Sequence, residues 1–167
     1  WEGRRFRVQA SCVLVAQFEQ LNARPQSVSC NEGYGGRQTR VIDGEETTWS
    51  NIYGKKFFEV QAGVTETNHG ILGYLVVTSA EWWDGLPADI RGQLSQILQE
   101  VTETRNAEST KVNNLNKKNI IDAGGVVRTL TPEQRQAWVD AMKPVWKKFE
   151  DQIGADLMEA ALSSNNE

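Results

Sequence analysis

Residues 4–28 read RRFRVQASCVLVAQFEQLNARPQSV, and this stretch decides the fold class of the chain. Its alternating start predicts a strand at about residues 4–9. Apolar residues at helical spacing after Ser11, a good N-cap, predict a short amphipathic helix. QSVS, residues 26–29, predicts a second strand. Strand, helix and strand follow one another as in a βαβ unit, so we expect an α/β fold.

VIDGEETTWSNIYGKKFFEVQ, residues 41–61, sets an acidic, hydroxyl-rich turn directly before aromatic residues at helical spacing. We expect a third strand in VIDGEE that ends at Asp43-Gly44, then a helix with Trp49 and Phe57 on one face. The preceding NEGYGGRQTR should be a weak helix, because each glycine costs roughly 0.8–1 kcal/mol relative to alanine. The turn is either a solvated loop before a core helix or the wall of a pocket.

The second half of the chain is mostly helical by pattern. Two extended pieces, GVTETNHG and the β-rich ILGYLVVTS, are hinged at Gly70. A long helix should begin with Pro87 at its first position, carry one buried apolar stripe and end near Asp122. A short strand in GGVVRTL follows, and TPEQ at residues 131–134 starts another helix with a capping box. Gly154 precedes a last helix, and the final SSNNE should be frayed.

Composition and charge exclude several classes of protein. The 167-residue chain has a formal net charge of -4 and no basic block, which argues against nucleic acid as a partner. Its apolar runs are too short to span a bilayer. The hydrophobic content of 39% is ordinary for a domain with a buried core. Because the chain starts at Trp1 without an initiator Met, we interpret it as a processed or truncated product.

The cysteines and the single histidine do not indicate a metal site or an enzyme. Cys12 and Cys30 lack the number and spacing of ligands that zinc needs, so we expect no metal and no cofactor. A Cys12–Cys30 disulfide stays open, because sequence cannot place the two Cα atoms within bridging distance. An acid/base hydrolase that uses Glu32 and His69 is a further hypothesis, but the sequence contains no nucleophile elbow that would support it.

The order of motifs along the chain resembles the solute-binding proteins of TRAP transporters, the DctP-like family. The motifs are FRVQAS, NEGYGGRQTRVIDGEETT, KFFEVQ, TNHGILGYLVV, EWWDGLPADIR, TPEQR and FEDQIGADL. Each motif alone is weak, but together, in the family's order and spacing, they cover essentially the whole chain. Members of this family are two-lobed periplasmic proteins considerably longer than this chain. The resemblance therefore implies the C-terminal portion of such a protein.

The resemblance also implies a division of the chain. Residues 1–69 would form the second α/β lobe of a periplasmic-binding-protein-like fold, with the first lobe largely absent. Residues 70–86 would be a returning strand and turn of the first lobe, and 87–123 the long helix that spans both lobes. Residues 124–167 would add a short strand and the closing helices.

Three candidate binding residues come from the strand and the turn. Arg7 stands where the family has the arginine that clamps a ligand carboxylate, and a guanidinium can grip a carboxylate with two hydrogen bonds. Thr47 stands at the asparagine of the family's QENP turn, which reads EETT here. Trp49 either forms a wall of the pocket or packs in the core behind it.

Four further candidates line the cleft by resemblance. Cys30 replaces an aromatic residue of the family, and Asn68 lies in the TNH motif at the crossing between lobes. Glu32 either orients the ligand or the arginine, or it is an acidic helix start that the macrodipole favours. His69 either donates to an anionic ligand or bonds to the backbone of the hinge.

The function implied by the resemblance is that of an extracytoplasmic, periplasmic solute-binding component of a TRAP-type transporter. Such a protein is not an enzyme; it binds a small organic acid and delivers it to membrane subunits. The alternative is a truncated or degenerate lobe that acts as a structural or interaction domain without ligand. ILGYLVV would lack its neighbouring strands in the isolated chain, so we also expect self-association through it.

Overall fold

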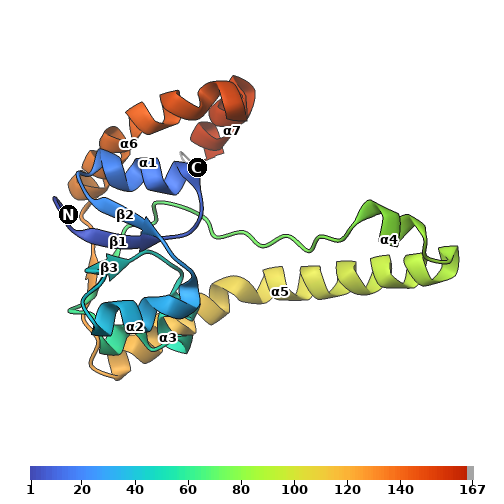
Figure 1. Cartoon of the computed structure of the whole chain (residues 1–167), viewed down its shortest axis with the longest axis horizontal. Helices are drawn as coiled ribbons and strands as arrows, with labels where there is room; N and C mark the ends of the chain where they lie inside the picture. The colour runs from blue at the N-terminus through green and yellow to red at the C-terminus, as the bar shows by residue number, and fades with distance from the viewer. Residues whose placement is uncertain (165–167) are drawn as a thin grey trace.

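The structure is a computed structural model that describes residues 1–164. A small α/β lobe carries a long helical arm (Figure 1). Its strands are β1 (Arg5–Val8), β2 (Arg24–Ser27), β3 (Gly44–Glu45), β4 (Val64–Glu66) and β5 (Val127–Thr129). Its helices are α1 (Cys12–Gln20), α2 (Gly33–Gln38), α3 (Trp49–Gly54), α4 (Ala80–Asp84), α5 (Ala88–Asp122), α6 (Pro132–Ile153) and α7 (Ala155–Ser164). Two 3₁₀ turns are η1 (Cys30–Glu32) and η2 (Phe57–Glu59).

The strands form two parallel sheets, which confirms the α/β class. The larger sheet has the order β2-β1-β3, and its register pairs Arg7 with Gln26 on one side and with Glu45 on the other. Strands β4 and β5 form the second sheet. Helices α1 and α6 lie over one face of the larger sheet, and α2 and α3 lie over the other (Figure 1). Arg7 and Glu45 are thus neighbours across two adjacent strands.

Buried clusters of the described residues hold these layers together. The first joins α1 to α6, the second joins β1 to α1, and the third joins α3 and η2 to the end of α5. Their buried members are Ala16, Met142, Val145 and Phe149; Val8, Phe18 and Ala23; and Ile52, Phe57 and Ile120. The third cluster anchors the foot of the long helix in the lobe, because Ile120 is completely buried there.

The third strand and the following helix are shorter than predicted. Strand β3 begins at Gly44, where the sequence predicted an end, because the Asp43 carboxylate accepts the backbone N–H of Arg5 at 2.9 Å in place of a strand carbonyl. The helix expected through residue 61 ends at Gly54. Lys56 then takes a left-handed conformation with a φ of 58°, which interrupts the helix before η2.

The helices of the second half agree with the sequence patterns at their ends. Helix α5 runs to Asp122 as predicted, but Pro87 precedes it instead of occupying its first position. Thr131 and Gln134 form the predicted capping box of α6. The end of the chain expected to fray lies partly outside the described residues. Among residues 1–164, no helix is long and apolar enough to cross a membrane.

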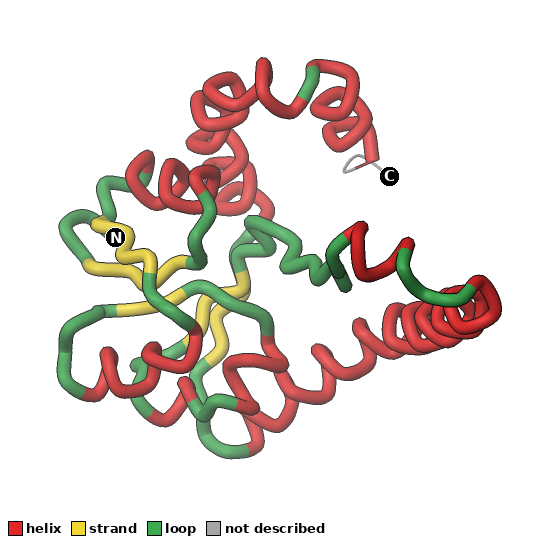
Figure 2. The backbone as a smooth tube through the Cα atoms, turned by 45° about the vertical axis from the view of Figure 1, so that its right-hand side comes forward, coloured by secondary structure: helices red, strands yellow, loops and turns green. Residues whose placement is uncertain are grey.

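The arm differs most from the prediction. Residues 67–79 form neither helix nor strand in the described structure. They extend from the lobe to the side on which α5 also extends, and α4 connects them to the start of α5 (Figures 1 and 2). Ile71 is fully exposed, and Leu75 is 89% exposed. The α5 stripe expected to be buried is also open, with Ile97 55% exposed. A strand needs a neighbour for its backbone hydrogen bonds, and none of the described strands pairs with residues 67–79.

Candidate functional site

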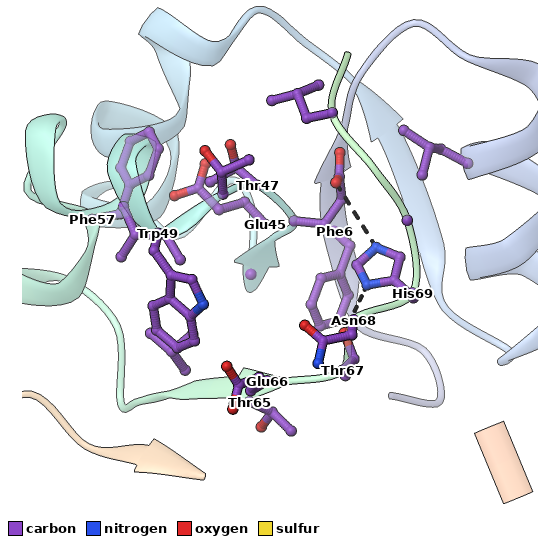
Figure 3. A pocket seen from close by; sticks show the side chains of 18 of the residues that line it. Phe6, Glu45, Thr47, Trp49, Phe57, Thr65, Glu66, Thr67, Asn68 and His69 are labelled. Atoms are coloured by element: carbon purple, nitrogen blue, oxygen red, sulfur yellow. Dashed lines mark hydrogen bonds and ion pairs between the residues drawn. The ribbon is translucent and has the colours of Figure 1, made fainter. Parts of the chain in front are cut away.

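A cavity of about 750 Å³ lies between strand β3 and the segment that follows η2 (Figure 3). This volume is in the usual range for small-molecule sites, roughly 300–1,000 Å³. Of the predicted binding residues, Thr47, Trp49, Asn68 and His69 line the cavity. The lining drawn from residues 1–164 does not include the other predicted residues, which are Arg7, Cys30 and Glu32.

Arg7 lies beneath the cavity rather than at its surface. Its side chain is carried by β1, and the residue is only 3% exposed. Its Nε donates to the carbonyl oxygen of Val28 at 2.9 Å, and its Nη1 donates to the carbonyl oxygen of Glu46 at 3.5 Å. Neighbouring Arg5 instead pairs with Asp43, with Nε 3.1 Å from Oδ2. The Arg7 guanidinium is therefore fixed by backbone acceptors next to the cavity residue Glu46.

Glu46, Thr67 and His69 form one linked group on the cavity wall. The Thr67 hydroxyl lies 2.7 Å from His69 Nδ1, and His69 Nε2 lies 3.9 Å from Glu46 Oε2; both interactions are dashed in Figure 3. Burial lowers the pKa of His69, which favours the neutral imidazole. Burial raises the pKa of Glu46, while the backbone N–H of Gln9 and the charge of Arg7 act in the opposite direction. His69 thus bonds side chains rather than backbone.

Glu45 is a cavity residue that sequence reasoning missed. Both of its carboxyl oxygens are buried and have no hydrogen-bond partner among the described residues. Burial raises the pKa of Glu45 to about 7, with Arg7 opposing the shift and Glu46 adding to it. The available signal was the strand register, which sets Glu45 beside Arg7. A buried carboxyl of this kind favours its neutral, proton-donating form.

The EETT turn becomes the N-terminus of α3. The Thr48 hydroxyl accepts the backbone N–H of Asn51 at 3.4 Å, while the Thr47 hydroxyl accepts from Asn51 Nδ2 at 2.8 Å. Trp49 lines the cavity and also packs against the cluster around Ile52. Trp49 therefore has both of the predicted positions: it forms part of the cavity wall, and it also packs against the core.

Glu32 and the cysteines have structural partners. Glu32 closes a capping box with Ser29, accepting from its hydroxyl at 2.9 Å, as expected for an acidic helix start. Cys30 packs at the edge of the cluster around Phe57. Cys30 and Cys12 are both free thiols, so the disulfide left open by the sequence does not form here. Residues 1–164 contain no group of three or more His, Cys, Asp and Glu side chains arranged to hold a metal ion.

Comparison with known proteins identifies the family. The family model described as bacterial extracellular solute-binding protein, family 7 (DctP), matches residues 1–152. The chain belongs to this family. It is 73% identical over 164 residues to the C4-dicarboxylate-binding periplasmic protein DctP of Vibrio cholerae, covering 98% of this chain and 49% of that protein. Its identity to the DctP protein of Shewanella loihica is 51% over 165 residues, again with 49% of that protein covered.

Solved structures of TRAP periplasmic solute-binding proteins share the fold of this chain. A TRAP periplasmic solute-binding protein from Shewanella oneidensis, with bound succinate, superposes with a TM-score of 0.95 at 48% sequence identity. The match covers 98% of this chain and 54% of the Shewanella oneidensis chain. A second such protein, from Pseudomonas aeruginosa PAO1 with bound L-malate, superposes with a TM-score of 0.85 at 40% sequence identity. That match covers 88% of this chain and 52% of the Pseudomonas aeruginosa chain. The chain spans about half the length of these relatives. The α/β, periplasmic-binding-protein-like fold predicted from the sequence is confirmed.

Proposed function

We propose that this chain is the ligand-clamping portion of a TRAP-type solute-binding protein and that its cavity takes a small organic acid. In this proposal Arg7, which is 3% exposed in this structure, has to be uncovered before it can grip one ligand carboxylate, assisted by Thr47, Asn68 and His69, which line the cavity. The observation that carries it is Arg7 itself, a buried guanidinium held by two backbone carbonyls beside the cavity and not ion-paired to any described carboxylate. Relatives that bind C4-dicarboxylates, succinate or malate support the ligand class.

Energetics limit what Arg7 can contribute alone. A hydrogen bond to a charged group contributes roughly 1.5–3 kcal/mol, whereas micromolar binding needs roughly 8 kcal/mol. The remainder has to come from burial of the ligand and from further polar contacts. We propose that residues 1–69 act as one lobe and that a second lobe, reached through the 70–86 segment and the 87–123 helix, closes over the ligand. Residues 124–167 would add the short strand and the closing helices.

The experiment is isothermal calorimetry with succinate and L-malate on the wild type, on Arg7→Ala and on Arg7→Lys. We expect the Arg7 variants to lose binding, because lysine keeps the charge but cannot form the paired hydrogen bonds of a guanidinium. Arg4→Ala is the matched control, since Arg4 is exposed just before β1. Equal binding by the wild type and Arg7→Lys would refute the proposed role of Arg7 in gripping the ligand carboxylate. Because the proposal needs both lobes for tight binding, only the absence of binding by a protein that carries both lobes would favour the alternative of a structural or interaction lobe without ligand.

The same proposal assigns location and partners. A chain of this family would work in the periplasm and pass its ligand to the membrane subunits of the transporter, without catalysing a reaction. The exposed apolar segment from Ile71 to Val77 further suggests that isolated chains associate through it. Size-exclusion chromatography with light scattering tests this, with Val76→Lys as the disrupting variant. A wild type that stays monomeric at high concentration would refute the self-association.

A further inference from the structure

The carboxylates around the cavity lie in different surroundings. Asp43 is paired with Arg5, and the carboxyls of Glu45 and Glu46 lie in surroundings that disfavour their charge. Glu66, on strand β4, is the remaining glutamate of the cavity lining. Its Oε2 lies 2.7 Å from Lys117 Nζ, and the two side chains are only 18% and 27% exposed. Because little solvent reaches this pair, salt screens it weakly.

Lys117 contacts two residues of the cavity wall without lining the cavity itself. It is carried by α5, close to the foot of the long helix, and it is not among the described lining residues. Its ammonium group also lies 5.4 Å from the centre of the Trp49 ring, a cation–π distance. The Thr129 hydroxyl lies 3.5 Å from the same Glu66 oxygen. One lysine therefore contacts both an acidic and an aromatic residue of the wall.

We propose that Lys117 is a positioning residue that makes the cavity selective for anions, by neutralising Glu66 and by holding the indole of Trp49 in the wall. The inference rests on the proposed function, in which the cavity takes a carboxylate. Figure 3 shows the Trp49 indole extending toward β4, the strand that carries Glu66. Without Lys117, a partly buried carboxylate in the wall would face the incoming acid, and like charges at short range repel.

A purely structural role for Lys117 gives different expectations. The foot of α5 is also held by the fully buried Ile120 and by Asn113, whose Oδ1 accepts the backbone N–H of Ser50 at 3.2 Å. Loss of one more helix contact would lower stability but would not depend on ligand charge. It would also not be reversed by removing the charge of Glu66. Reversal by removal of the Glu66 charge therefore separates the two roles.

The test compares Lys117→Met, Lys117→Arg and the double variant Lys117→Met/Glu66→Gln by calorimetry with succinate. We expect Lys117→Met to weaken binding by about tenfold or more, and both Lys117→Arg and the double variant to recover most of it. Lys118→Met is the matched control, because Lys118 is exposed and pairs with Asp122 on the outer side of α5. An equal effect of the two methionine variants, or a double variant as weak as Lys117→Met, would overturn the inference.

Fluorescence of the ligand-free protein gives a second readout. Lys117→Met should change the Trp49 contribution to the emission, measured as the difference from the same variant in a Trp49→Phe background, whereas Lys118→Met should not. An unchanged Trp49 contribution would refute the positioning of the indole. If a protein that carries both lobes takes up no succinate, the proposed function fails and the selectivity for anions fails with it. The emission would then still decide whether Lys117 positions Trp49.

Discussion

Glu45 Oε2 occupies the space that a side chain would need at Gly33. A Cβ atom added to Gly33 would lie 2.5 Å from this oxygen and 3.2 Å from Cζ of Phe57. Gly33 is buried at the start of α2, and its backbone has ordinary helical angles. The glycine is therefore required by the close approach of Glu45 from the next layer, not by its own conformation.

Gly33→Ala should destabilise the protein, although alanine favours a helix by roughly 0.8–1 kcal/mol over glycine. The Glu45 carboxyl would have to leave its buried position, and the Phe57 ring would have to shift by a few tenths of an ångström. Overpacking of this kind costs roughly 1–3 kcal/mol. Thermal unfolding followed by circular dichroism measures the loss.

The control removes the group that causes the clash. In a Glu45→Ala background only the Phe57 ring, 3.2 Å from the added Cβ atom, still has to shift, so the same Gly33→Ala change should cost much less. Gly35→Ala is a second control in the same helix, because nothing lies within 4 Å of a Cβ atom there. Equal losses from Gly33→Ala in both backgrounds would show that Glu45 is not the obstacle.

The stability of the wild type should fall as the pH rises from about 4.5 to above 7, relative to Glu45→Gln. The pKa of Glu45 is raised from 4.5 to about 7 in the folded state, mainly by burial. A group with a raised folded pKa stabilises the fold fully below its unfolded pKa, and this contribution is lost as the pH passes its folded pKa. The pH dependence of the midpoint in urea, measured for both proteins, checks the difference.

Other groups titrate in the same range and must cancel in the comparison. Burial shifts Glu46 in the same direction as Glu45, while the lowered pKa of His69 makes the fold less stable as the pH falls. Both groups remain in Glu45→Gln, so the difference between the two proteins isolates Glu45. Parallel curves between pH 4.5 and 8 would refute an unpaired buried carboxyl at this position.

Ile120→Ala should lower the free energy of unfolding by about 2–5 kcal/mol, since it leaves a cavity in the cluster that anchors α5. Ile120 is completely buried there beside Ile52 and Phe57. Its neighbour Ile121 is 49% exposed, so Ile121→Ala is the matched control and should change stability by about 0.5 kcal/mol or less. Urea unfolding of the two variants gives the comparison. Similar losses would contradict the burial assigned to Ile120.

Thr131→Ala should cost about 1 kcal/mol through loss of the N-cap of α6. The Thr131 hydroxyl accepts the backbone N–H of Gln134 at 3.2 Å, and Gln134 Oε1 accepts the backbone N–H of Thr131 at 2.9 Å. Thr131→Ser keeps the hydroxyl and should retain nearly full stability. Chemical denaturation distinguishes the two variants, and equal stability of Thr131→Ala and Thr131→Ser would exclude the cap.

The βαβ order of the first residues and several helix ends could be predicted because their signals are local. The capping box at Thr131, the Ser11 cap and the end of α5 at Asp122 depend on residues within one or two turns. The short third strand could not be predicted in the same way. Its beginning depends on a side-chain bond from Asp43 to the backbone of Arg5, 38 residues away in sequence.

Burial was predicted less well than periodicity. The apolar stripe of α5 has helical spacing, yet Ile97 and Val101 are more than half exposed. A pattern states which residues share a face but not whether another part of the molecule covers that face. The same distinction applies to Arg7: the resemblance implied a ligand contact for it, and spacing along the chain could not show that it is only 3% exposed.

The sequence by itself determined the α/β order, the capped helices and the family, because these follow from hydrophobic period, cap residues and the order of motifs. Only the tertiary structure decided the chemistry of the cavity wall. Strand register set Glu45 beside Arg7, and the packing of α5 brought Lys117 to Glu66 across 51 positions of sequence. Burial and charge depend on such pairings through space, and spacing along the chain does not encode them.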